Sequence, residues 1–170
     1  MGYRIEDINQ CEETRFIELL GGIFEHSPWV AELVYDRRPY ASREALHEIM
    51  AEAVRRAPQF QRMALLCNHP ELAGREARAG NLTRDSRREQ SGAGLDQCSA
   101  AELEHIQALN RAYREKFEFP FIIAVSGLDK RQIIEAMERR LRNEQSDEFA
   151  TALGEVEKIA RIRIDALIDA

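Results

Sequence analysis

Only one run in this sequence has the composition of a buried β-strand. It covers residues 119–125 and reads Phe119-Pro120-Phe121-Ile122-Ile123-Ala124-Val125. A strand must pair its backbone groups with a neighbour, yet no second comparable run occurs in the 170 residues. Pro120 also lacks the N–H that a central strand would donate. We therefore predict that this run is an extended apolar segment, buried within an otherwise helical protein.

Elsewhere the apolar residues recur at the spacing of amphipathic helices. One helix is expected over residues 9–20, where Gly21-Gly22 ends the pattern, and another follows the Ser42 N-cap. Ser99-Ala-Ala-Glu102 has the form of a capping box that opens a long helix. We predict an all-α protein, a compact bundle of about seven or eight helices that forms one domain over residues 1–170.

Charge and cysteine usage restrict the partners and the compartment. The formal net charge is −6, whereas a protein that binds duplex nucleic acid needs a basic surface. No apolar run approaches the roughly 20 residues that span a bilayer, and charged residues begin at Arg4. Cys11, Cys67 and Cys98 are odd in number and widely spaced, as expected of thiols in a reducing compartment. We expect a cytoplasmic protein that binds neither nucleic acid nor membrane.

His69 is the first candidate for chemistry. It precedes Pro70, which disfavours the α conformation, so we expect an extended His69 at the end of the preceding helix. Its imidazole can act as general acid or base, or it can merely cap the carbonyl groups of that helix. A metal site with Glu71 lacks further ligands at suitable spacing. A Cys67–His69 nucleophile is disfavoured because Cys67 ends an apolar run and fits a core position.

Two further positions leave a structural and a functional interpretation open. Ser86-x-x-Glu89 fits a capping box, but the same helix start could face a small anionic or polar ligand. Arg163 falls inside the apolar stripe of the last helix, whereas Arg161 points elsewhere. Because a buried guanidinium is costly unless it is paired, Arg163 meets either an internal carboxylate or a ligand carboxylate.

Several motifs together resemble the 2-oxo-4-hydroxy-4-carboxy-5-ureidoimidazoline (OHCU) decarboxylases, in the order in which that family carries them. The resemblance extends from about residue 9 to the C-terminus. The motifs are Ser27-Pro28-Trp29, Arg38-Pro39-Tyr40, His69-Pro70-Glu71-Leu72-Ala73-Gly74, Ser86-x-x-Glu89-Gln90-x-x-Ala93-Gly94-Leu95, Asn110-x-x-Tyr113, Phe119-Pro120-Phe121-Ile122-Ile123 and Lys158-Ile159-Ala160-x-x-Arg163.

This resemblance implies an all-helical, usually dimeric enzyme that needs no cofactor or metal. Its substrate would be OHCU, which loses CO2 to give (S)-allantoin at the last step of urate breakdown. His69, Glu89 and Arg163 are then the expected catalytic residues. The expected substrate-binding residues are Pro70, Ser86, Arg87, Gln90, Phe121, Ile122, Ile123, Ala124 and Val125.

Two rival functions remain open at the level of the sequence. The first is a helical interaction module in which Trp29, Tyr40 and the apolar segment near Phe121 bind another protein, while His69 only caps a helix. The second is a metal-dependent hydrolase. A closed pocket that joins the candidate residues favours the decarboxylase, whereas an open apolar groove favours the interaction module.

Overall fold

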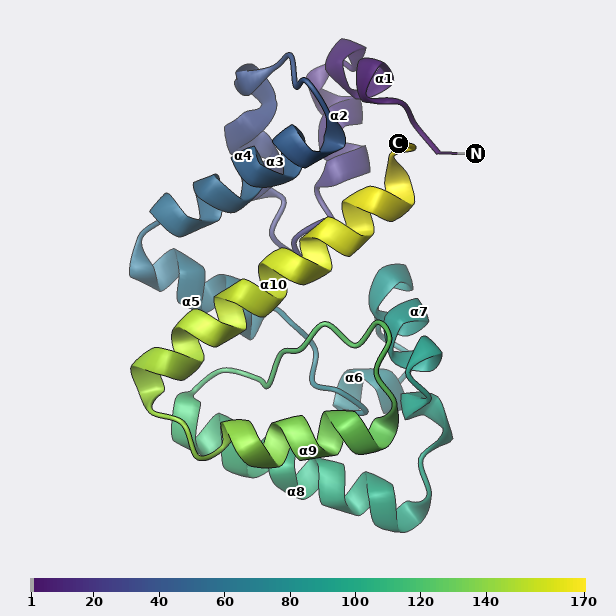
Figure 1. Ribbon diagram of the computed structural model, residues 1–170, viewed down its shortest axis with the longest axis vertical. Coiled ribbons are helices and arrows are strands. Elements are labelled where there is room, and N and C mark those ends of the chain that lie inside the picture. Colours follow the sequence, from purple (N-terminus) through teal and green to yellow (C-terminus); the bar gives the residue numbers. More distant parts are fainter. Residues whose placement is uncertain (1) are drawn as a thin grey trace. The chain divides into compact units, whose positions relative to one another are not determined.

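The computed structural model describes residues 2–170 and confirms the all-α class (Figure 1). Within this range the chain forms ten α-helices and two short 3₁₀ helices, η1 and η2. The helices are α1 (Ile5–Gln10), α2 (Glu13–Leu20), α3 (Trp29–Val34), η1 (Tyr35–Arg37), α4 (Arg43–Arg56), α5 (Gln59–Cys67), α6 (Arg75–Arg78), α7 (Arg84–Gly92), η2 (Leu95–Gln97), α8 (Ala100–Phe117), α9 (Lys130–Arg140) and α10 (Gln145–Leu167).

By packing, the chain divides into two compact units. Unit 1 contains the residues up to Asn68 together with Val156–Ala170, and unit 2 is His69–Glu155. The first half of α10 belongs to unit 2 and its second half to unit 1. The assignment of residues 1–170 to one domain stays a prediction.

The first helices of unit 1 differ from the expectation. The single helix predicted over residues 9–20 is wrong, because α1 ends at Gln10 and α2 begins at Glu13. Arg38 explains the break, since its Nη1 donates to the carbonyl oxygens of Asn9 at 3.1 Å and Cys11 at 2.7 Å. These carbonyls would accept helical hydrogen bonds if α1 continued into α2. Apolar spacing alone does not reveal this competition.

The core of unit 1 forms between α2, α3 and α4. Leu20, Val30, Leu46 and Met50 are all buried there. The predicted N-cap of α4 is confirmed, because the Ser42 hydroxyl accepts from the backbone N–H of Ala45 at 3.2 Å. The two ends of the described chain also meet in this unit, where one isolated parallel bridge joins Tyr3 to Ile168 (Figure 1).

Unit 2 is organised around α8 and an aromatic cluster. The predicted capping box of α8 is confirmed: Ser99 and Glu102 each accept a backbone N–H from the other. Tyr113 lies 4.5 Å from Phe117 and 5.2 Å from Phe121, measured between ring centroids. Such tilted and edge-to-face pairs contribute more than their buried area alone. The cluster fixes the end of α8 against the segment that follows it.

The strand-like run is an extended segment without a sheet, as predicted. No helix or strand is assigned to residues 120–125, and Phe121, Ile122 and Val125 are buried. Buried backbone groups need hydrogen-bond partners. The carbonyl of Ile122 finds one in Arg140, whose Nη1 lies 2.6 Å away.

A buried ion pair joins α9 to α10 within unit 2. Arg140 donates through Nε and Nη2 to the carboxylate of Glu148, with distances of 3.0 to 3.1 Å. Glu148 is fully buried and also accepts from Tyr113 Oη and from Asn143 Nδ2. Burial pushes the pKa of Glu148 upward, but the bonds from Arg140, Tyr113 and Asn143 prevail and hold it below its usual range.

The lowered pKa of Glu148 predicts acid sensitivity of the fold. A carboxyl whose pKa is lower folded than unfolded stabilises the protein above its unfolded pKa of about 4.3, and this contribution is lost as pH falls through the folded value. Melting temperatures measured between pH 7 and pH 2.5 should therefore fall below about pH 4.3. Glu148→Gln should flatten that part of the profile. A profile of the same slope in both proteins would contradict the prediction.

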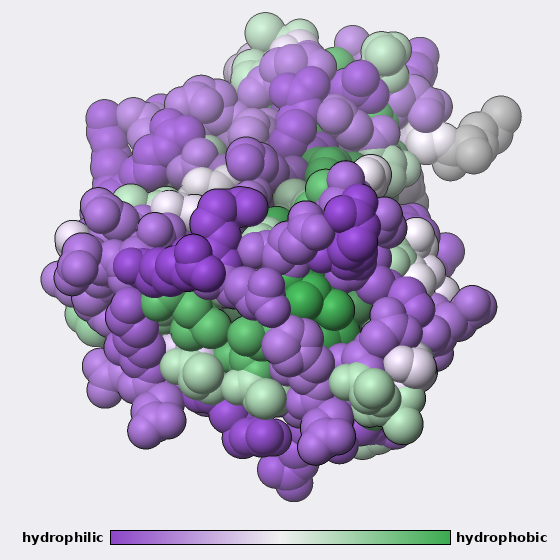
Figure 2. Space-filling model, turned by 60° about the horizontal axis from the view of Figure 1, so that its bottom comes forward, coloured by the Kyte–Doolittle hydropathy of each residue, from purple (hydrophilic) through white to green (hydrophobic). Residues whose placement is uncertain are grey.

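The visible surface is mostly hydrophilic, with smaller hydrophobic areas between hydrophilic residues (Figure 2). This agrees with a chain in which 32% of the residues are charged. Within residues 2–170, no helix combines the length and the hydropathy needed to span a membrane.

Candidate active site

His69 lies in a bend two residues after α5, and it is buried with 7% of its surface exposed. Pro70, which follows it, is half-buried. Three side chains from α7 and α8 hold the next residues of this loop. Asn110 Nδ2 donates to the carbonyl of Leu72 at 3.0 Å, and Gln90 Oε1 accepts from the backbone N–H of Ala73 at 3.0 Å.

The third side chain is Arg114, whose Nε lies 3.1 Å from Glu71 Oε1. Glu71 is therefore part of an ion pair that ties the loop to α8. Within residues 2–170, no group of three or more His, Cys, Asp and Glu side chains gathers in a way that could hold a metal ion. Cys67 is exposed, so its predicted core position is wrong.

Ser86 does not cap α7, so the predicted capping box with Glu89 is wrong. The N-cap lies three residues earlier, at Thr83, whose Oγ1 accepts from the N–H of Ser86 at 3.2 Å, and the helix begins at Arg84. Thr83 carries the same kind of hydroxyl three residues before Ser86, but it was not considered as a cap from the sequence. This earlier start places Ser86 in the first turn, where it is buried.

The predicted residues of α7 fall on two faces. Ser86, Glu89 and Gln90 have the i, i+3, i+4 spacing of one helix face; Ser86 and Gln90 are buried and Glu89 is half-buried. Arg87 is exposed, and its Nη2 donates to the carbonyl of Gly80 at 3.0 Å. The structure therefore groups three of the four polar candidates on α7 and separates Arg87 from them.

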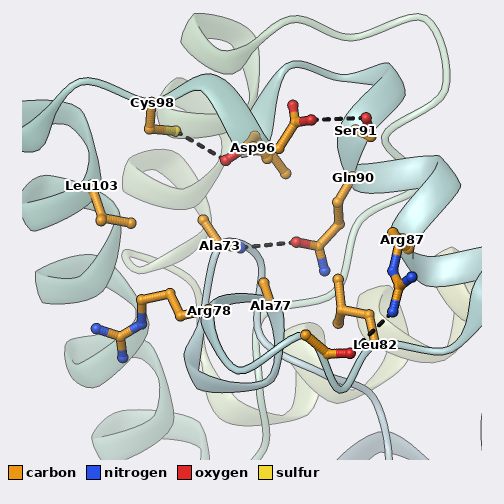
Figure 3. A pocket seen from close by; sticks show the side chains of 12 residues that line it. Ala73, Ala77, Arg78, Leu82, Arg87, Gln90, Ser91, Asp96, Cys98 and Leu103 are labelled. Carbon is orange, nitrogen blue, oxygen red and sulfur yellow. Dashed lines mark hydrogen bonds between the residues drawn. The ribbon is translucent and has the colours of Figure 1, made fainter.

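A pocket of about 440 Å³ lies beside α7, within the size range of small-molecule sites (Figure 3). Of the predicted substrate residues, only Arg87 and Gln90 line it. In Figure 3 the Gln90 amide points at the backbone of Ala73, whose N–H donates to Gln90 Oε1. The other lining residues are Ala73, Ala77, Arg78, Gly80, Leu82, Ser91, Leu95, Asp96, Cys98 and Leu103.

The extended segment belongs to the same unit as His69 and α7. Within the described part of this unit, the backbone groups of Ile123 and Ala124 form no hydrogen bond, and both residues are half-buried. Extended backbone of this kind can bind the edge of a planar amide ring. Unlike the backbone groups of Ile123 and Ala124, the carbonyl of Ile122 already accepts a hydrogen bond, from Arg140.

Arg163 belongs to unit 1, where it meets an internal carboxylate. Its Nη1 lies 2.6 Å from Glu25 Oε2 and 3.1 Å from the carbonyl oxygen of Gly22. The side chains of Arg163 and Glu25 are 2% and 1% exposed. Arg161 lies on a different face of α10 and pairs at the surface with Glu44 and Asp165. The predicted contrast between the two arginines is confirmed, and so is the internal ion pair as one of its alternatives.

Comparison with known proteins decides the family. Residues 9–165 match the family described as OHCU decarboxylase. The chain belongs to the OHCU decarboxylase family. A protein of Halalkalicoccus jeotgali named 2-oxo-4-hydroxy-4-carboxy-5-ureidoimidazoline decarboxylase is 41% identical over 163 residues, which are 96% of this chain and 90% of that protein.

Two solved structures share the fold of this chain. A crystal structure described as (S)-allantoin synthase superposes with a TM-score of 0.79 at 30% identity and covers 98% of this chain; the chain spans 54% of that one. A second structure, described as OHCU decarboxylase in the presence of (S)-allantoin, has a TM-score of 0.70 and covers 94% of this chain and all of that one. At 22% identity this second match supports the fold alone.

Sequence reasoning did not single out Arg114, Arg140 or Glu148 in this OHCU decarboxylase family member. Asn110 was noted only as part of the Asn110-x-x-Tyr113 motif. A polar residue within the apolar stripe of a helix is itself a signal, because a buried amide needs partners. Asn110 Oδ1 is buried and accepts no hydrogen bond within the described residues, while its Nδ2 supports the histidine loop.

Proposed function

We propose that this protein removes CO2 from OHCU to give (S)-allantoin, with His69 as the proton donor. The observation that carries the proposal is the family match over residues 9–165, because every predicted site residue lies inside it. Decarboxylation then places the protein in urate degradation. The burial of His69 and the three contacts that fix its loop support a role in catalysis, since a proton donor must be held in a defined direction.

The chemistry of the substrate explains why side chains suffice. When the bond between ring carbon 4 and the carboxylate breaks, the electron pair moves toward carbon 5 and onto the ring nitrogen of the C=N bond. The product of this step is an enol, and protonation of carbon 5 from one face gives a chiral product as the 4-hydroxyl becomes a carbonyl. One proton is taken up overall. The substrate supplies its own electron sink, so the protein must orient it and deliver the proton.

The roles of the other residues follow from their positions. Ser86 lies in the first turn of α7, where backbone N–H groups and the helix dipole favour a polar or anionic group of the substrate. Glu89 shares that face and can accept hydrogen bonds from the ureido or ring amides. Gln90 Oε1 accepts from Ala73 and its Nε2 donates one N–H to the carbonyl of Glu71 at 3.5 Å, so Gln90 would meet the substrate through its second amide N–H.

The remaining contacts proposed within unit 2 come from Pro70 and the extended segment. Pro70 continues the His69 loop, and the backbone groups of Ile123 and Ala124 match the donors and acceptors of the substrate ring. For Arg163, which lies in unit 1, the family resemblance alone supports a role in holding the group that leaves as CO2, because its Nη1 already donates to Glu25 and Gly22. Among the predicted substrate-binding residues, Arg87 has the least structural support, because its guanidinium is exposed and donates to the carbonyl of Gly80.

The direct test generates OHCU from urate in the cuvette and follows the circular dichroism of allantoin. With the protein present, chiral allantoin should form faster than OHCU decays by itself, and one enantiomer should dominate. Racemic allantoin at the spontaneous rate would overturn the proposal and favour the helical interaction module. Dialysis against a chelator should leave the rate unchanged; a rate that falls and returns with added metal would favour the metal-dependent alternative.

We also propose that the protein is a cytoplasmic homodimer, as the family resemblance implies. Sedimentation velocity at micromolar concentration should give twice the mass of one chain. A monomer mass together with full decarboxylase activity would contradict the dimer. Cell fractionation that recovers the protein outside the soluble fraction would contradict the proposed location.

A further inference from the structure

We infer that Arg140 is a positioning residue for substrate binding: it fixes the carbonyl of Ile122 and thereby sets the direction of the backbone groups of Ile123 and Ala124. This inference rests on the proposed function, because it requires that the extended segment binds OHCU. Arg140 lies on α9 and contacts neither His69 nor α7 through any hydrogen bond of its own within unit 2.

The segment has little else to hold its backbone. It has no neighbouring strand, and its remaining backbone hydrogen bond in the described residues runs from the N–H of Leu128 to the carbonyl of Val125 at 3.0 Å. Side-chain packing anchors Phe121 through Tyr113, but packing does not fix the rotation of the peptide planes that follow. The 2.6 Å bond from Arg140 to Ile122 supplies that restraint.

Arg140 touches the segment at two consecutive residues. Its guanidinium carbon lies 4.4 Å from the centroid of the Phe121 ring, while Nη1 donates to the next carbonyl along the chain. Stacking on an aromatic ring and hydrogen bonding in the guanidinium plane are compatible only for a planar cation. A lysine at position 140 would keep the positive charge, but it could not stack on Phe121 and donate to the Ile122 carbonyl at the same time. Arginine and lysine are therefore not equivalent at this position.

Glu148 keeps Arg140 in this orientation. Three Arg140 contacts of 3.0 to 3.1 Å reach its carboxylate, and Tyr113 and Asn143 donate to the same group. A buried ion pair is weak evidence for stability, because desolvation offsets much of the attraction. We therefore assign to this ion pair the role of orienting Arg140 and, through Arg140, the Ile122 carbonyl.

The test is the kinetics of Arg140→Lys, with circular dichroism and melting temperature measured on the same samples. Contacts made equally in the ground state and the transition state affect KM and not kcat. Losing a charged hydrogen bond that orients the segment should raise KM about tenfold while kcat changes less than about threefold. A KM equal to that of the wild type, with only the melting temperature lowered, would overturn the inference.

Two control variants separate positioning from stability. Arg139→Lys changes an exposed arginine one residue earlier on α9 and should leave KM unchanged. Ile133→Val shortens a fully buried side chain of the same helix, so it should lower the melting temperature without raising KM. If Ile133→Val raised KM as much as Arg140→Lys, the effect would reflect unit stability and the inference would be wrong.

A milder variant covers the case in which Arg140→Lys does not fold. Tyr113→Phe removes one donor to Glu148 but keeps the ring in the aromatic cluster, and it should raise KM about two- to threefold. An unchanged KM in a folded Tyr113→Phe would then overturn the inference. The wild type separates this inference from the proposed function: an inactive wild type refutes the function, whereas an active wild type with an insensitive variant refutes only the positioning role.

Discussion

Replacing His69 with asparagine is expected to abolish the formation of chiral allantoin while the fold remains intact. A positioned general acid typically contributes about a hundredfold to ten-thousandfold in rate, so kcat should fall at least about a hundredfold. Asparagine is close in size and polar, so it fits the buried position without leaving a large cavity. The measurement is the initial rate of circular dichroism change with OHCU generated in situ.

His105→Asn is the matched control for this variant. His105 also belongs to unit 2, but it is exposed, and its Nε2 pairs with Glu138 at 2.9 Å on the surface. Surface pairs contribute little, so both turnover and melting temperature should stay near those of the wild type. If His69→Asn retained turnover close to that of the wild type, the catalytic role of His69 would be refuted.

Arg163→Ala should reduce kcat/KM much more than Arg161→Ala. If the Arg163 guanidinium holds the substrate carboxylate, its removal should cost about 3 kcal/mol of binding, or roughly a hundredfold, whereas Arg161→Ala should stay within about threefold. Arg161 lies at the surface, with Asp165 and Glu44 as its partners. The measurement is kcat/KM for both variants under the same conditions. Equal losses of kcat/KM in the two variants would refute the role of Arg163 in substrate binding.

The Arg163–Glu25 pair requires a control for stability. Alanine at position 163 leaves the buried Glu25 carboxylate without its cation, which typically costs about 3–5 kcal/mol. Glu25→Gln keeps Arg163 in place and removes the partner charge instead. We expect Glu25→Gln to lower the melting temperature but to retain most of the activity. Comparable activity losses in Glu25→Gln and Arg163→Ala would mean that Arg163 acts only through the fold.

The predictions that came true rest on local rules. The Ser42 and Ser99 caps follow from which side chains can accept the first backbone N–H groups of a helix. The extended segment follows from the absence of a second strand. Arg163 and Arg161 differ because residues two apart lie on different faces of a helix. The caps and the contrast between the two arginines depend on neighbours within a few positions, whereas the extended segment required a comparison with the rest of the chain.

The predictions that failed involve competition between distant or equivalent groups. The break between α1 and α2 depends on Arg38, which lies 27 residues beyond Cys11. The start of α7 depends on a choice between Thr83 and Ser86, two hydroxyl residues with similar cap preferences. The spacing of apolar residues gives no information about either choice. The observed helix boundaries therefore differ from the predicted ones even where a helix was correctly expected.

The sequence by itself determined the all-α class, the lone extended segment, the family and the candidate site residues, because periodicity, caps and the order of motifs can be read along the chain without knowledge of its contacts. The tertiary structure decided which partners the polar side chains choose. It paired Arg163 with Glu25, tied the His69 loop to Asn110, Gln90 and Arg114, and placed Arg140 on the carbonyl of Ile122. These choices depend on which groups are buried together, and only the folded chain brings such groups into contact.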